Sequence, residues 1–105
     1  MPTITTTSFT VTSANITTVE VGTNCPQGGD SGHGGRTLFR IQDEAATDLR
    51  VRCDDGPETD ANSIAIILGG DCECEAFIEL LERGLAALKA QHAANQATKN
   101  TREVA

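Results

Sequence analysis

Glycine is concentrated in one short stretch of this 105-residue chain, and that stretch limits where regular secondary structure can form. Five glycines fall between positions 28 and 35, within the sequence CPQGGDSGHGGRT. Glycine loses more conformational entropy than any other residue when a helix or strand forms, so no regular element survives at this density. We therefore predict a loop here, with regular elements on either side of it.

Strand patterns lie on both sides of this loop. Two Thr-rich, β-branched segments, residues 8–13 and 16–23, precede it and predict two short strands joined by a turn. After it, apolar residues alternate with arginines at period two, so residues 36–42 and 48–54 predict an antiparallel hairpin. The continuous apolar run at 63–70 then predicts a strand that is central or covered on both faces.

A helix is predicted to follow. Asp71 can cap it, with Glu73 and Glu75 in the first turn, where the helix dipole favours negative charge. Apolar side chains then recur at helical spacing and form one stripe: Phe77, Ile78, Leu81, Leu85 and Leu88. Gly84 lies beside this stripe, where we expect it to mark a close approach by another backbone. The pattern then fades, which makes residues 92–105 the polar end of the helix or a tail.

These elements together predict an α+β fold, with about five strands in a mainly antiparallel meander followed by one C-terminal amphipathic helix. Residues 1–91 form a single domain in this prediction. The chain has no Trp, no Tyr and only three Phe, so large hydrophobic anchors for a core are few. We therefore expect a homo-oligomer that associates through the apolar stripe of the C-terminal helix.

Charge and hydropathy restrict the function classes. A net charge of −7 argues against a general nucleic-acid binder, which needs a basic surface to release counterions from phosphates. The sequence contains no apolar run of about 20 residues, and its beginning lacks the basic and apolar segments of a secretion signal. We expect a cytoplasmic protein without a membrane span.

The cysteines are too few and too irregularly spaced to predict a disulfide framework: Cys25, Cys53, Cys72 and Cys74. On a helix, Cys72 and Cys74 would point about 200° apart, which is poor geometry for zinc. A metal site that combines these thiols with His33 is the less favoured interpretation. We expect mostly reduced thiols, no metal and no cofactor.

Part of the glycine loop, Gly29-Asp30-Ser31-Gly32, is similar to the sequence around a serine-protease nucleophile. Such proteases are much longer, and their His and Asp precede the Ser, whereas His33 and His92 both follow Ser31. No neighbouring residue in the sequence obviously orients His33. We therefore expect no catalytic residue and a non-enzymatic protein, with a small hydrolase as a secondary alternative.

Half of the eight basic residues are arginines that lie close together after the loop: Arg36, Arg40, Arg50 and Arg52. On one face of the predicted hairpin their guanidinium groups repel one another unless negative charge lies nearby. The chain itself can supply that charge from carboxylates close in the sequence: Glu20, Asp43, Glu44, Asp48 and Asp54. The alternative source is a bound anion.

The glycine loop supports the bound anion. Backbone N–H groups in Gly28-Gly29 and Gly34-Gly35 can form a concave nest for phosphate, and arginine is a forked phosphate ligand. The loop matches neither the nucleoside-triphosphatase loop nor the dinucleotide-binding fingerprint. The predicted ligand-binding residues are Gly28, Gly29, Asp30, Ser31, His33, Gly34, Gly35, Arg36, Arg40, Arg50 and Arg52.

The loop from Asn24 to Thr37, followed by a strand, a later Gly69-Gly70-Asp71 and a C-terminal helix, resembles small uncharacterised bacteriophage and prophage proteins. The resemblance covers about residues 16–90. Such proteins include oligomeric sponges that sequester nucleotide signals of bacterial immunity, so it implies sequestration of a phosphate-containing nucleotide in an infected host's cytoplasm. The leading alternative is an acidic module that binds and inhibits a host defence protein.

Overall fold

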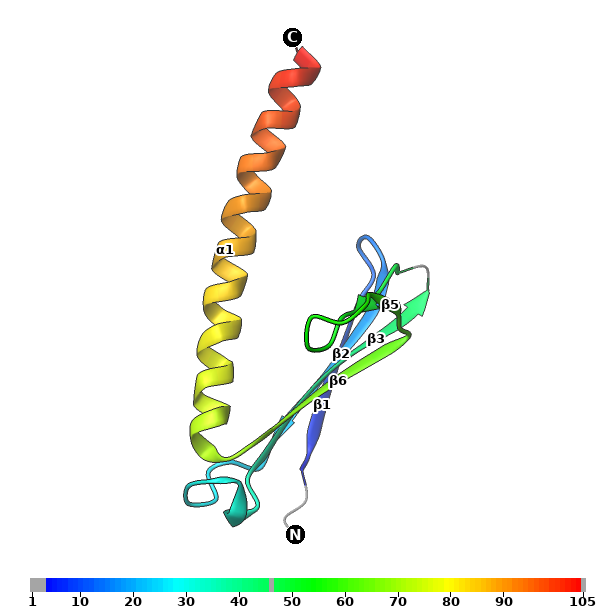
Figure 1. Cartoon of the computed structure of the whole chain (residues 1–105). Helices are drawn as coiled ribbons and strands as arrows, with labels where there is room; N and C mark the ends of the chain where they lie inside the picture. The colour runs from blue at the N-terminus through cyan, green and yellow to red at the C-terminus, as the bar shows by residue number, and fades with distance from the viewer. Residues whose placement is uncertain (1–3, 46, 105) are drawn as a thin grey trace. The chain divides into compact units, whose positions relative to one another are not determined.

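The computed structural model describes residues 4–45 and 47–104. It confirms the α+β fold, with strands in a meander and one C-terminal helix (Figure 1). The strands form a four-stranded sheet and a separate two-stranded sheet, where the sequence predicted about five strands in one. The chain divides into two compact units, one that ends at Cys74 and one that begins at Glu75.

The main sheet is antiparallel throughout and has the strand order β1-β2-β3-β6. Its strands are β1 (Thr6–Val11), β2 (Ile16–Thr23), β3 (Arg36–Ala45) and β6 (Ser63–Gly69). Val19 on β2 lies opposite Phe9 on β1 and Ile41 on β3, and Ile64 on β6 lies opposite Ile41. Residues directly opposite each other share a face, so these four apolar side chains lie on one face of the sheet.

This apolar face is incompletely covered. The structure has no fully buried side chain among the described residues, and Phe9 is 59% exposed. The prediction that the strand at 63–70 is central or covered on both faces is wrong, because β6 lies at one end of the strand order and Ile66 and Ile67 are 42% and 68% exposed. An edge strand has a neighbour on one side alone, which leaves its side chains more open.

The predicted hairpin between 36–42 and 48–54 is also wrong. β3 pairs with β2 on one side and with β6 on the other, so neither of its edges is open to the 48–54 segment. That segment contributes the short strand β4 (Arg50–Val51), which pairs with β5 (Thr59–Asp60) in the two-stranded sheet. The arginines at 36 and 40 therefore lie in a different sheet from Arg50.

The helix α1 (Asp71–Val104) begins at Asp71, the residue that was predicted to cap it, and continues for 34 residues, so residues 92–104 are helical. Its apolar stripe is largely exposed, at Ile78, Leu81, Leu85 and Leu88. An added Cβ at Gly84 would meet no atom of the described chain within 4 Å, so the expected close approach is not found there. Across the described residues, no helix combines the length and apolar character that crossing a membrane requires.

Candidate functional site

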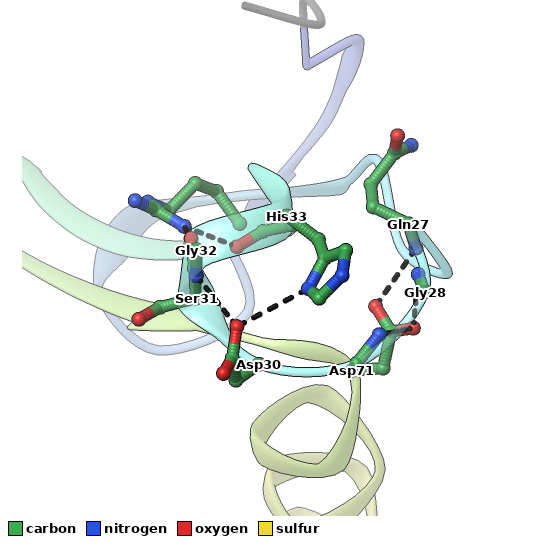
Figure 2. A network of polar contacts seen from close by, with 10 residues as sticks. Gln27, Gly28, Asp30, Ser31, Gly32, His33 and Asp71 are labelled. Atoms are coloured by element: carbon green, nitrogen blue, oxygen red, sulfur yellow. Dashed lines mark hydrogen bonds and ion pairs between the residues drawn. The ribbon is translucent and has the colours of Figure 1, made fainter.

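The glycine loop between β2 and β3 closes on the carboxylate of Asp71, the first residue of α1 (Figure 2). Asp71 Oδ1 accepts a hydrogen bond from the backbone N–H of Gln27 at 2.9 Å. Its Oδ2 accepts from Gly28 at 2.8 Å and from Gly29 at 3.0 Å. Three successive N–H groups that converge in this way form a nest, the backbone arrangement that holds an anion.

Backbone bonds in the opposite direction complete this closure. The N–H of Asp71 donates to the carbonyl of Gly29 at 2.8 Å, and that of Gly70 donates to Gly35 at 3.0 Å. Gly28 and Gly29 have φ angles of 110° and 135°, which residues other than glycine rarely adopt. The glycines therefore allow the loop to adopt a closed conformation, in which the nest lies against the first residue of the helix.

The nest also sets the ionisation of Asp71. The hydrogen bonds from Gln27 and Gly28 lower the pKa of its carboxyl below the ordinary value of 3.8, with smaller contributions in the same direction from Gly29 and the Cys25 thiol. Partial burial opposes this shift but does not cancel it. Asp71 is therefore an anion at neutral pH, and the loop amides are bonded to a charge from the chain itself.

Asp30 and His33 form a second, largely exposed cluster around the 3₁₀ turn η1 (Ser31–His33) of the loop. Asp30 Oδ1 accepts from the N–H of Gly32 at 2.9 Å and lies 3.2 Å from His33 Nδ1. The imidazole ring lies beside Gly29, where an added Cβ would be 3.6 Å from it. The sequence offered no partner that orients His33, and the structure supplies Asp30.

Ser31 is not directed toward this Asp–His pair. Its Cβ lies against Gly69 at the end of β6, whereas the His33 ring lies on the side of Gly28 and Gly29. Figure 2 shows the Ser31 side chain turned away from the imidazole. Within the described chain no hydrogen bond joins Ser31 to His33, so a base and a nucleophile are not assembled here.

The four arginines have different partners. Arg40 Nη2 lies 2.9 Å from Glu20 Oε1 on the neighbouring strand. Arg50 lies 2.9 Å from Asp48 and 2.8 Å from Glu58, and the pKa of its guanidinium is raised by hydrogen bonds to these two carboxylates. The chain's own carboxylates thus neutralise two of the four, Glu20 and Asp48 being on the list that the sequence suggested.

Arg36 differs because backbone carbonyls hold it. Its Nη1 donates to the carbonyl of Ser31 at 2.9 Å and to that of Gly35 at 2.7 Å. No carboxylate within ion-pair distance of Arg36 is found in the part of the chain that the structure describes. The fourth arginine, Arg52, lies just after β4 and is exposed.

The structure therefore divides the predicted ligand-binding residues. Those of the loop and the start of β3 lie together: Gly28, Gly29, Asp30, Ser31, His33, Gly34, Gly35 and Arg36. Arg40 lies four residues further along β3, roughly 13 Å away at strand spacing, and Arg50 and Arg52 belong to the two-stranded region. Sequence reasoning missed Asp71 and Gln27 as loop residues; its only signal for Asp71 was the helix cap after Gly69-Gly70.

Two thiols lie behind the loop. Cys25 Sγ donates to the carbonyl of Gly70 at 3.5 Å, and Cys74 Sγ lies 3.6 Å from Thr23 Oγ1. Thr23 in turn bonds to Thr37 at 2.9 Å. All four cysteines are free, and within the described residues no group of three or more His, Cys, Asp or Glu side chains is placed to hold a metal ion.

Comparison of the chain with protein-family models, with curated proteins and with solved structures finds no match.

Proposed function

We propose that this protein is a non-enzymatic ligand-binding protein that sequesters a small phosphate-containing nucleotide at the rim formed by residues 30–36. One observation carries this proposal: Arg36 is held by two backbone carbonyls, with no carboxylate partner in the described chain. It is a positioned, uncompensated cation in a molecule with a net charge of −7. A phosphate group fits this environment.

The geometry of Arg36 supports the assignment. Both hydrogen bonds that its side chain makes within the described residues come from Nη1, which leaves the Nε and Nη2 edge of the guanidinium for a bidentate contact. The exposed Ser31 hydroxyl and the Asp30–His33 pair lie on the same turn and can bond to sugar hydroxyls or a base edge. Since Asp71 already fixes the loop, little ordering entropy is lost when a ligand binds.

Sequestration requires affinity for the ligand and no catalytic groups. This is consistent with a rim in which the Ser31 and His33 side chains do not contact each other. The exposed apolar stripe of α1, with Leu85 and Leu88 as its most exposed members, supports the further proposal of a homo-oligomer associated through that helix. An anti-defence role in the cytoplasm of an infected bacterium belongs to the same proposal, through the resemblance to small phage proteins.

The test is a thermal-shift titration of the full-length protein with a panel of cyclic, linear and ADP-ribose-type nucleotides. A ligand present at 100 times its Kd adds about 2.7 kcal/mol of stability, so Tm rises with ligand concentration. Arg36→Ala should abolish the rise and Arg36→Lys should weaken it, whereas the matched control Arg52→Ala should retain it.

Two outcomes would favour the alternatives. If no nucleotide of the panel shifts Tm, the acidic protein-interaction module becomes the better hypothesis. If a bound nucleotide is recovered from the heated complex in cleaved form, the protein is a small hydrolase. Recovery of the intact ligand supports sequestration.

A further inference from the structure

The free edge of β1 is a surface that the proposed ligand site does not use. β1 lies at the other end of the strand order from β6, and its hydrogen-bonded neighbour in the sheet is β2. Its six residues, TTSFTV, are all exposed. They pair with β2 in continuous register from Thr6–Gly22 to Val11–Thr17, without a bulge. One side of this strand therefore presents a straight row of backbone N–H and C=O groups.

Natural proteins protect such edges with charged side chains, prolines, bulges or very short strands. β1 has none of these devices, since it contains only Thr, Ser, Phe and Val and spans six residues. The interior strand β2, by contrast, carries both Glu20 and an irregularity at Ile16/Thr17. An edge that is regular, uncharged and exposed is a ready template for another strand.

We propose that β1 pairs antiparallel with β1 of a second copy of this chain, about a two-fold axis perpendicular to the sheet. Charge favours this occupant. Two copies with a net charge of −7 repel each other in general, but the carboxylate that bonds to β1 is neutralised. Glu20 accepts from Thr6 Oγ1 at 2.7 Å and lies 2.9 Å from Arg40. No like charges meet at this edge, and a basic partner would find no uncompensated carboxylate on it.

Side-chain matching points the same way. A two-fold axis perpendicular to the sheet keeps the apolar faces of both copies on one side. Phe9 then lies opposite Phe9 of the copy and Val11 lies diagonal to it; they are 59% and 57% exposed in the single chain. With Phe9 opposite its counterpart, Ser8 faces Thr10. Hydroxyl pairs of this kind already bridge β1 and β2, where Thr10 and Thr18 are 2.8 Å apart. The interface is self-complementary and closes as a dimer.

The experiment measures the mass of the full-length protein by sedimentation equilibrium over a range of concentrations. The double variant Ser8→Lys/Thr10→Lys places ammonium groups opposite each other across the pair, which should raise the dimer Kd at least about 100-fold. The matched control Ser63→Lys/Ile67→Lys adds the same charge to two exposed residues on the corresponding face of β6 and should leave the Kd unchanged.

Hydrogen exchange on the unmodified protein gives a measurement that does not depend on the folding of a variant. The β1 amides should become more protected as concentration rises through the Kd. A monomer at all concentrations, equal association of the two lysine variants, or β1 protection that is independent of concentration would each overturn the proposal. Retained association of the β1 variant with concentration-independent β1 exchange would assign self-association to the helix, separately from nucleotide binding.

Discussion

Asp71 and Gly28 lie 43 residues apart in the sequence, and the carboxylate of Asp71 accepts a hydrogen bond of 2.8 Å from the backbone N–H of Gly28. Together with the bonds from Gln27 and Gly29, this contact connects the loop between β2 and β3 to the first turn of α1. The glycine loop is therefore attached to the first residue of the helix, and its residues 30–36 form the proposed ligand rim.

Replacing Asp71 should loosen the attachment of the glycine loop to the helix. Asp71→Ala removes the acceptor of three backbone N–H groups, so we expect Tm to fall by several degrees and the amides of Gln27, Gly28 and Gly29 to exchange faster. Thermal unfolding with hydrogen-exchange mass spectrometry measures both effects. The control Asp48→Ala removes a carboxylate from an exposed ion pair and should change Tm much less. Equal effects of the two variants would contradict this role.

Acid should weaken the same attachment of the loop to Asp71. The pKa of Asp71 in the folded protein lies below its ordinary value of 3.8, so its contribution to stability is complete above that value and declines as pH falls through the lower, folded value. The Tm difference between the wild type and Asp71→Asn should therefore be constant near neutral pH and shrink in acid. A difference that stays the same in strong acid would show that ionisation of Asp71 does not hold the loop.

Two glycine-to-alanine substitutions should have opposite effects. A Cβ at Gly35 would lie 3.1 Å from both Cys25 Sγ and Asp71 Oδ1, so Gly35→Ala overpacks the loop and should cost about 1–3 kcal/mol. A Cβ at Gly84 would meet nothing within 4 Å, so Gly84→Ala should stabilise the helix by up to about 1 kcal/mol. Denaturant unfolding measures both. Destabilisation by Gly84→Ala would indicate a neighbouring chain at that position.

The ion pair between Arg40 and Glu20 should be coupled across β2 and β3. Their side chains are 41% and 22% exposed, so the pair is partly shielded from solvent. We expect a double-mutant cycle with Arg40→Met and Glu20→Gln to give a coupling energy of about 1 kcal/mol that decreases in high salt. Arg40→Met alone should be the more harmful single change, because it leaves the Glu20 carboxylate without its cation. A coupling energy near zero would show that this ion pair does not contribute to the stability of the sheet.

The local parts of the fold were predictable because they depend on short patterns. The period-two alternation around Phe39 and Ile41 gave a strand, and Asp71 followed by two glutamates gave the start of the helix. The pairing of strands was not predictable, because no local pattern in the sequence specifies that β3 pairs with β2 and β6 rather than with the segment that follows it. Asp54 and Asp55 turn the chain with φ angles of 49° and 57°, just before Gly56 and Pro57, so two aspartates adopt a backbone conformation that favours glycine.

The site was predictable only in part, for a related reason. Glycine density indicated a nest, and the structure contains one at Gly28 and Gly29. The carboxylate of Asp71 occupies this nest. Because an aspartate at this position is already accounted for by the start of the helix, no sequence pattern pointed to its contact with the loop. Contacts between residues so distant in the chain are set by the tertiary fold and leave no local pattern in the sequence.

The Asp71 nest has a consequence for selectivity. A backbone cradle with empty amides would attract every abundant small inorganic oxyanion, and such ions would compete with a scarce signalling molecule. Here the internal carboxylate of Asp71 already accepts the three amides, so an inorganic ion would have to displace it. Under the proposed function, the ligand is therefore a larger molecule that engages Arg36 and the turn at residues 30–33 together.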